Sequence, residues 1–286
     1  MNNLRLIPLT LIALFLASCS NSDDNNDNGP ITGNFFPSTI GDLWTYDVEG
    51  TNSNDSNLNF SETDFIGVGT SQSNNFTLIA NNNISPASGV MNALLVDGIL
   101  TKGESTLNYS GNLELPAEFA DFSNTEIPLQ NILLYDLNAS TNEILSEVSG
   151  SFSQNLDLDG DLLPLTITYT LTTKKISLMN SLNVNGETFS NVFRGELNLS
   201  MKVVTPIDLL GLGNPVDYDL LATQDVITIE NYFAKDIGLI KSEAIITYEL
   251  DPGLISILND LSIDLGIPED LTLENTQEIV NYLISE

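Results

Sequence analysis

Side-chain oxygens recur at every second position in one short stretch of the chain, at Asn155, Asp157, Asp159 and Asp161. With Gly160 between the last two, this spacing matches the front half of a calcium-binding loop, where alternate residues supply oxygen ligands and a glycine allows a sharp bend. The twelfth position, which carries an acidic ligand in a complete EF-hand loop, is Thr166 here. A complete EF-hand is therefore excluded. A partial Ca²⁺ site is the one cofactor that the sequence suggests.

A β-hairpin explains the same stretch without a metal. In that interpretation, an Asp159-Gly160 turn joins two strands, Phe152–Leu158 and Leu162–Leu171. The acidic side chains would then lie on the face that meets water. Titration with Ca²⁺ distinguishes the two interpretations, because only a metal site would give heat or a shift in melting temperature.

The residue types that most often carry catalysis are scarce. The chain has no histidine and a single cysteine, which excludes Ser-His-Asp and Cys-His catalysis, His-ligated zinc or haem, internal disulfides and thiolate clusters. Pairs of carboxylates need no histidine, but the Asp-Thr-Gly and Asp-Ser-Gly motifs of aspartic proteases do not occur. No Gly-rich phosphate loop is present either. We therefore expect no catalytic residues and a protein that is not an enzyme.

The single cysteine stands directly after an apolar leader. Arg5 precedes an apolar run from Leu6 to Leu16, which ends in Leu16-Ala17-Ser18-Cys19. This run is too short to span a bilayer but fits the apolar region of a signal peptide. The ending resembles the lipobox of bacterial lipoproteins, which implies that residues 1–18 are a signal peptide and that Cys19 carries the lipid. A chain with two or three acyl groups is held firmly in a membrane.

Residues 19–34 are predicted to form a flexible tether. From Ser20 to Pro30 the chain has no apolar side chain and several acids and amides, so it cannot pack against a core. Its Ser22-Asp23-Asp24 resembles the acidic signal of surface-exported Bacteroidota lipoproteins. The resemblance implies an outer-membrane, lipid-anchored protein at the cell surface, with a periplasm-facing position as the alternative.

The charge of the chain is strongly acidic. Eight Lys and Arg stand against 39 Asp and Glu, for a net charge of −31 at pH 7. A field of this sign repels phosphate backbones, so nucleic acid is excluded as a partner. The same charge also explains a soluble, non-adhesive surface.

Period-two alternation of apolar and polar residues dominates from Phe35 onward and predicts half-buried strands. Asn185-Gly186 predicts a tight hairpin turn, because both residues accept positive φ, and Asp97-Gly98 predicts a weaker one. No long helix separates the strands, which disfavours a parallel sheet. The expected strands are Leu43–Glu49, Leu58–Val68, Phe76–Ala80, Thr106–Leu115, Leu162–Thr172, Lys175–Val184, Glu187–Val204, Val226–Phe233 and Leu239–Leu250.

The sequence therefore predicts a single, mainly β domain over residues 35–286. Its expected form is an antiparallel meandering sheet or open half-barrel with one or two short C-terminal helices. Helical spacing of apolar residues places these helices at Gly253–Leu265 and at Asn275–Ser285.

An opening segment and a pair of later segments resemble a broad group of Bacteroidota lipoproteins. Phe36-Pro37, Gly41, Trp44 and Tyr46 follow that group's opening pattern "FP…G..W.Y", and the segments Val184–Val192 and Asn231–Lys241 follow its paired later elements. The group resembles the half-barrel lipoprotein-carrier fold, a curved antiparallel sheet around an apolar cavity. Trp44 and Tyr46 share a strand face and would fill the core, or Trp44 would line a ligand pocket. Gly238 suits a tight turn between two long strands.

Two non-enzymatic functions remain open. The first is a membrane-anchored binding or interaction module whose partner is a protein or a glycan. The second is a carrier of a hydrophobic, lipid-like small molecule in a half-barrel cavity. The aromatic content of 7% argues mildly against a sugar-stacking surface.

Overall fold

The computed structural model describes residues 33–115, 126–158, 161–208, 214–260, 263 and 265–285. Cys19 and most of the predicted tether lie outside these residues, so the lipid anchor stays a prediction. Within the described residues, no helix is both long and apolar enough to cross a membrane.

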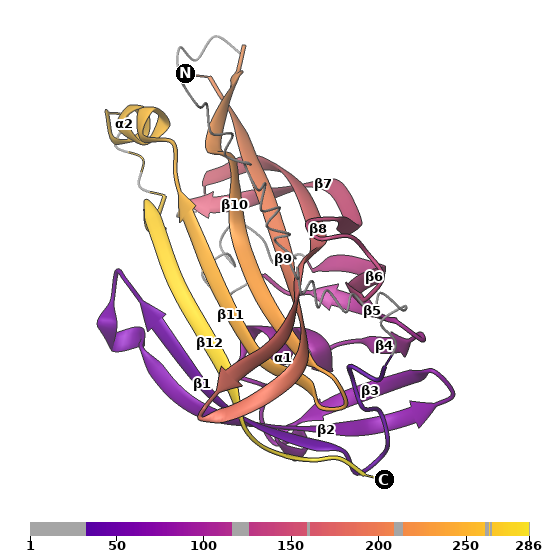
Figure 1. Cartoon of the computed structure of the whole chain (residues 1–286). Helices are drawn as coiled ribbons and strands as arrows, with labels where there is room; N and C mark the ends of the chain where they lie inside the picture. The colour runs from indigo at the N-terminus through magenta and orange to yellow at the C-terminus, as the bar shows by residue number, and fades with distance from the viewer. Residues whose placement is uncertain are drawn as a thin grey trace, which may run out of the picture. The chain divides into compact units, whose positions relative to one another are not determined.

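The described chain folds into one 12-stranded antiparallel sheet that is nearly closed and barrel-shaped (Figure 1). The spatial order is β6-β5-β4-β3-β2-β1-β12-β11-β10-β9-β8-β7. Every neighbouring pair except β1 and β12 is also adjacent along the chain, as the predicted meander requires. The strands are β1 (Leu43–Asn52), β2 (Phe60–Gln72), β3 (Asn75–Ala80), β4 (Ile99–Lys102), β5 (Thr106–Leu113), β6 (Ile127–Asp136), β7 (Ile144–Leu158), β8 (Asp161–Val184), β9 (Glu187–Ile207), β10 (Val216–Ala234), β11 (Gly238–Glu249) and β12 (Asp270–Leu283).

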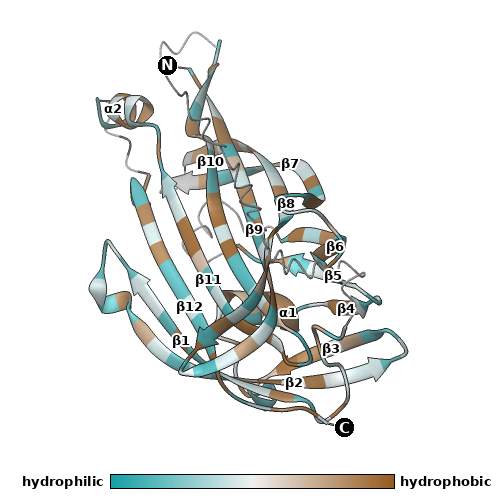
Figure 2. Cartoon of the chain, viewed as in Figure 1, coloured by the Kyte–Doolittle hydropathy of each residue, from teal (hydrophilic) through white to brown (hydrophobic). Residues whose placement is uncertain are grey.

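Alternation of side chains explains why these segments form strands with one face in the core. In β9, Leu197, Leu199, Met201 and Val203 are buried and every residue between them is partly exposed. The same bands of apolar and polar residues run along β8 to β12 (Figure 2). The apolar bands face the inside of the curved sheet, where successive inward side chains can pack on one another.

Two predicted turns are confirmed. Asn185 and Gly186 have φ of 50° and 84° and join β8 to β9. Gly238 has φ of 108° and follows the turn between β10 and β11. Both positions lie in the left-handed region that glycine and asparagine accept most readily.

Aromatic rings fill one end of the sheet's interior. Phe36 contacts Trp44 of β1, Phe76 of β3 and Phe233 of β10, with ring centroids 5.4, 5.6 and 6.1 Å away. Phe35 contacts Tyr135 of β6 at 6.1 Å. The segment before β1 therefore closes this end by inserting two rings between opposite walls of the sheet.

Lys175 joins the two edges of the sheet, β6 and β7, across the remaining gap. Its Nζ donates hydrogen bonds to the carbonyl oxygens of Leu137 and Ala139, each at 2.7 Å. Its backbone exchanges hydrogen bonds with Asn142 and Glu143 just before β7. Burial lowers the pKa of Lys175, against the opposing effect of Asp136 and Glu143. This arrangement completes the near-closure of the sheet.

Two expectations, one about a helix and one about a hairpin turn, were wrong. The segment 275–285 was expected to be a helix, but it falls largely within strand β12, which pairs with both β1 and β11. Its inward side chains include buried Asn275 and Gln277, so its apolar residues do not alternate and their spacing imitates a helix. Asp97-Gly98 does not connect two strands but ends helix α1 (Val90–Val96), which was not predicted. The other C-terminal helix is confirmed as α2 (Pro252–Asp260).

Candidate functional site

A cavity lies inside the curve of the sheet, beside the short helix α1. Its volume is about 690 Å³, within the range of roughly 300–1,000 Å³ that is typical of ligand sites. The lining is mostly apolar, and it comes from α1 and the loop before it, from strands β1, β2, β10, β11 and β12, and from the end of β5. This cavity is the candidate binding site.

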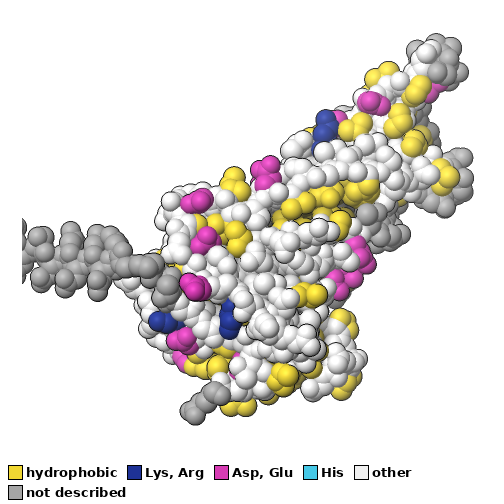
Figure 3. Space-filling model, turned by 90° about the vertical axis from the view of Figure 1, so that its right-hand side faces the viewer, with side chains coloured by type: hydrophobic (Ala, Val, Ile, Leu, Met, Phe, Trp, Pro, Cys, Tyr) yellow, Lys and Arg dark blue, Asp and Glu magenta, His cyan; other side chains and the backbone are white. Residues whose placement is uncertain are grey.

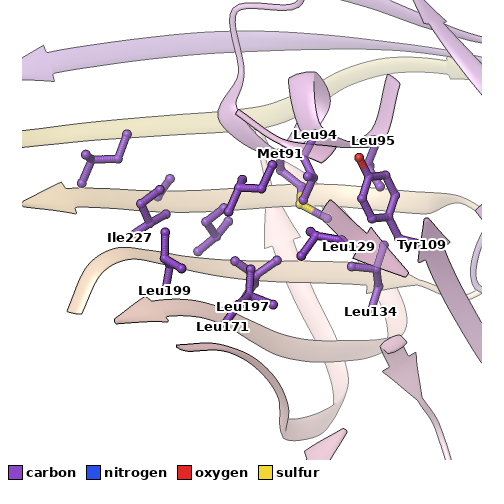
Figure 4. Packing of buried hydrophobic residues seen from close by; sticks show 14 of the residues in the cluster. Met91, Leu94, Leu95, Tyr109, Leu129, Leu134, Leu171, Leu197, Leu199 and Ile227 are labelled. Carbon is purple, nitrogen blue, oxygen red and sulfur yellow. The ribbon is translucent and has the colours of Figure 1, made fainter. Parts of the chain in front are cut away.

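Helix α1 forms one wall of the cavity and packs its other side into the core. Met91, Leu94 and Leu95 are buried and point toward the leucines and isoleucines of the sheet (Figure 4). Val90, Ala93 and Val96 are partly exposed and line the cavity together with Leu94. A helix of seven residues is not stable alone in water, so these contacts hold it in place.

Side chains of distant strands cap the beginning of α1. The Asp64 carboxylate of β2 accepts hydrogen bonds from the backbone N–H of Ser88 and Gly89, at 2.8 and 2.9 Å, and from Nδ2 of Asn92 at 3.0 Å. Two side chains of β12 complete the cap. Asn275 Oδ1 accepts from the Val90 N–H, and Gln277 Oε1 accepts from the Asn92 N–H.

These bonds replace the cap that α1 lacks in its own sequence, since its N-cap residue is Gly89. A side chain at Gly89 would also collide with the cap, because a Cβ atom there would lie 2.2 Å from Gln277 Oε1. The glycine therefore allows the close approach of the helix to β12. Asp64 and Gln277 are fully buried, with 0% exposure, and the cap satisfies their hydrogen-bonding groups.

The sheet provides the wall opposite α1. Ile227 of β10, Ile246 of β11 and Leu273 of β12 line the cavity from inward positions. They lie in one row, because Ile227 pairs with Ile246 and Ile246 pairs with Leu273. A ligand placed between α1 and this row would contact hydrocarbon on both sides.

Two exposed apolar side chains form a lip at the edge of the cavity. Phe60, at the start of β2, covers Gly50 of β1, where a Cβ atom would fall 2.0 Å from the Phe60 ring. Phe60 remains 39% exposed, and Leu58 of the preceding 3₁₀ turn (Ser56–Leu58) is 57% exposed. Exposed apolar side chains beside an apolar cavity are typical of a ligand entrance.

The charged side chains of the lining are all acidic. They are Asp97 at the end of α1, Glu114 directly after β5, and Glu274 of β12. Because side chains alternate between the two faces along β12, the Glu274 side chain points to the outer face. Only the backbone of Glu274 therefore lies at the cavity. On the side of the molecule that Figure 3 shows, acidic side chains are spread widely and basic ones are few.

Tyr109 lies near the two acids at the rim. Its hydroxyl donates to the carbonyl oxygen of Asn112, a lining residue, at 3.0 Å. Burial raises the pKa of Tyr109, and the negative charges of Asp97 and Glu114 raise it further, against a smaller lowering effect of the bond to Asn112. The negative charges of Asp97 and Glu114 therefore both raise the pKa of the same buried phenol.

Three of the four candidate calcium ligands fall in the described part of the β7–β8 hairpin, close to its turn. Asn155 pairs with Pro164, Asp157 with Leu162 and Asp161 with Leu158. This pairing confirms the hairpin. Asp159 lies outside the described residues, and the described part of the chain contains no group of three or more acidic or cysteine side chains placed to hold a metal. Calcium binding stays a prediction.

Trp44 and Tyr46 belong to the core rather than to the cavity. Trp44 is 1% exposed, and its Nε1 donates to the Ile237 carbonyl at 2.6 Å. The Tyr46 hydroxyl donates to the Leu239 carbonyl at 2.8 Å. These bonds connect β1 to the β10–β11 turn across the interior, which agrees with the architectural role expected for both residues.

Sequence reasoning expected a cavity inside a curved sheet but missed α1, its cap and the residues that line the cavity. The one signal available was the alternation of β12, in which Leu271, Leu273, Asn275, Gln277 and Ile279 fall on one face. Polar residues at two of these inward positions indicate buried partners. A scan against protein-family models finds no match, and neither the curated proteins nor the solved structures contain a significant match.

Proposed function

We propose that this protein is a lipid-anchored, non-catalytic binding protein that takes a hydrophobic small molecule into the cavity beside α1. The observation that carries the proposal is the cavity itself, because its size and largely apolar lining fit a ligand of that class. The exposed lip of Leu58 and Phe60 supports it, since an apolar ligand would enter most easily along apolar side chains. Of the two functions that the sequence left open, the carrier is favoured.

Filling the cavity tests this proposal. The mature chain from Ser20 onward, which contains every described residue, is titrated with the neutral fluorescent probe N-phenyl-1-naphthylamine. Ala93 lines the cavity, so we expect Ala93→Trp to weaken probe binding at least tenfold. Ala222 is exposed on β10 and does not line the cavity, so Ala222→Trp is the matched control. Equal binding by both variants and the wild type would contradict the proposal.

The anchor is proposed to be lipid on Cys19, with the protein at the outer membrane and facing the cell surface. Its support is the lipobox-like Leu16-Ala17-Ser18-Cys19 and the apolar run before it. Cys19→Ala should abolish incorporation of labelled palmitate and release the protein from lipid-mediated attachment. Palmitate labelling that persists in the variant would refute the anchor, while leaving the cavity proposal untouched.

A further inference from the structure

Carboxylates surround the polar end of the cavity. Asp97 belongs to the end of α1 and Glu114 to the segment after β5, and both line the cavity and are exposed at its rim. Neither side chain has a hydrogen bond or ion pair with any residue in the described part of the chain. Both charges are therefore available to a ligand whose apolar part lies between α1 and the sheet.

No basic side chain lines this cavity. Arg5 lies outside the described residues, and the others have partners elsewhere. Arg194, Lys202 and Lys241 form ion pairs with Glu230, Asp219 and Glu278 on the outer face of the sheet. The remaining four are Lys174, paired with Glu196, Lys175 at the gap between β6 and β7, Lys102, bonded to Ser38, and Lys235, packed against Gly33. Among the described residues, the positive charges are thus placed away from the cavity.

The position of Asp97 is unfavourable for the protein alone. A helix carries partial negative charge at its C-terminal end, so an acidic residue there is repelled rather than stabilised. Asp97 occupies the C-cap of α1, and Glu114 acts with it on the phenol of Tyr109. A positive group bound at the rim would relieve both repulsions.

We propose that the ligand of this cavity is an amphiphile with a cationic, amine-type polar end, which Asp97 and Glu114 recognise at the rim while α1 and the sheet hold its apolar chain. This inference rests on the proposed function and adds the chemical class of the ligand. An anionic amphiphile, such as a fatty acid, would bring its carboxylate next to two like charges with no cation to balance it. A neutral alcohol would gain the apolar contacts alone.

Three probes with the same chain and different polar ends test the inference: decylammonium, 1-decanol and decanoate. Their affinities for the mature chain are measured by isothermal titration calorimetry at pH 7.5. Each close charge pair at a protein surface changes affinity by roughly fivefold or more, so decylammonium should bind at least about tenfold more tightly than decanoate. Decanol should fall between them.

Variants assign this preference to the two carboxylates. Asp97→Asn/Glu114→Gln should reduce the ratio of decylammonium to decanoate affinity by about fivefold or more. Glu49→Gln/Glu147→Gln removes two exposed acids that do not line the cavity, and it should leave the ratio within about twofold. This control separates the rim from the general negative field of the chain.

The outcomes distinguish the two proposals. If decanoate binds as tightly as decylammonium, or if both double variants change the ratio equally, the cationic class is wrong. If all three probes bind equally and Ala93→Trp weakens them all, the cavity proposal stands and this inference fails. If none of the probes binds, the proposed function fails and the inference falls with it.

Discussion

At the scale of single residues, Phe36 lies at the centre of the aromatic cluster that fills one end of the interior. Phe36 is 1% exposed and contacts three rings from three different strands. It lies in the segment before β1, outside the backbone ladder of the sheet. That segment is also held by the Asp236 N–H, which donates to the Asn34 carbonyl, and by Lys102 Nζ, which donates to Ser38 Oγ. Truncation of Phe36 therefore removes packing that no backbone ladder replaces.

We expect Phe36→Ala to lower the free energy of unfolding by about 3–5 kcal/mol, the usual cost of deleting a buried aromatic ring. This change is measured by urea denaturation with the fluorescence of Trp44 as the signal, because Trp44 contacts Phe36 directly. Phe65→Ala is the control, since Phe65 is 55% exposed, and it should cost less than about 1 kcal/mol. Equal costs for the two variants would contradict the packing described here.

Buried phenols make the fold sensitive to alkali. Burial raises the pKa values of Tyr46, Tyr109 and Tyr135 above the usual 10, with Asp64 adding to the effect at Tyr46. Their contribution to stability is complete below pH 10, where both states are neutral. It falls above pH 10, because the unfolded chain then loses protons that the folded chain keeps.

Each such tyrosine should therefore lower stability by about 1.4 kcal/mol per pH unit between 10 and its folded pKa. In a titration followed at 295 nm, we expect the phenolate absorbance of at least three of the eight tyrosines to rise only together with the loss of circular dichroism. Ionisation of all eight tyrosines near pH 10 in a still-folded protein would show that these three are not buried as described.

At the scale of elements, helix α1 depends on side chains that are distant from it in the sequence. Its cap comes from Asp64, Asn275 and Gln277, which accept hydrogen bonds from N–H groups 24 to 185 residues away along the chain. The helix, and with it one wall of the cavity, therefore forms only when β2 and β12 are in place.

Asp64→Ala would leave the buried Gly89 N–H, the partly buried Ser88 N–H and the Asn92 side-chain amide without their acceptor. We expect a loss of about 3 kcal/mol in stability and weaker binding of the naphthylamine probe. Asp47→Ala removes an exposed acid of β1 and should change stability by less than about 0.5 kcal/mol. Unchanged stability and binding in Asp64→Ala would mean that the cap does not position α1.

The gap between β6 and β7 depends on Lys175 in a similar way. We expect Lys175→Met to increase hydrogen exchange at the backbone amides of residues 142 and 175 by about tenfold or more. The reason is that two charge-assisted hydrogen bonds across the gap are lost. Lys174→Met removes only the outer pair with Glu196, 3.7 Å apart, and should leave these amides protected. Similar exchange in both variants would show that the gap closes without Lys175.

These elements also show how much the sequence could predict. β9 was predicted because Leu197, Leu199, Met201 and Val203 alternate with polar residues, and the Asn185-Gly186 turn because few other residues accept its dihedral angles. β12 was mistaken for a helix, because its inward Asn275 and Gln277 look like outward residues in a pattern of hydrophobicity. Helix α1 could not be predicted, since Gly89 offers no cap and its stabilising partners are distant in sequence.

At the scale of the whole molecule, the features support the proposed tethered receptor for an apolar ligand. The sequence predicts a lipid anchor and an acidic tether before the sheet, and the described sheet curves around a largely apolar cavity whose charged lining residues are all acidic. The net charge of −31 favours the approach of cations over anions. An amphiphilic amine would meet a matching field first and an apolar interior second.

Photo-crosslinking tests this central claim most directly. The mature chain is irradiated with a decylamine that carries a diazirine in its alkyl chain, and the modified residues are mapped by peptide mass spectrometry. We predict adducts on the cavity walls, in residues 86–97, 112–115 and 273–275, and their loss in Ala93→Trp. Adducts confined to exposed apolar residues of the outer face, such as Ile245 and Val280, or adducts that persist unchanged in Ala93→Trp, would contradict a ligand site inside the sheet.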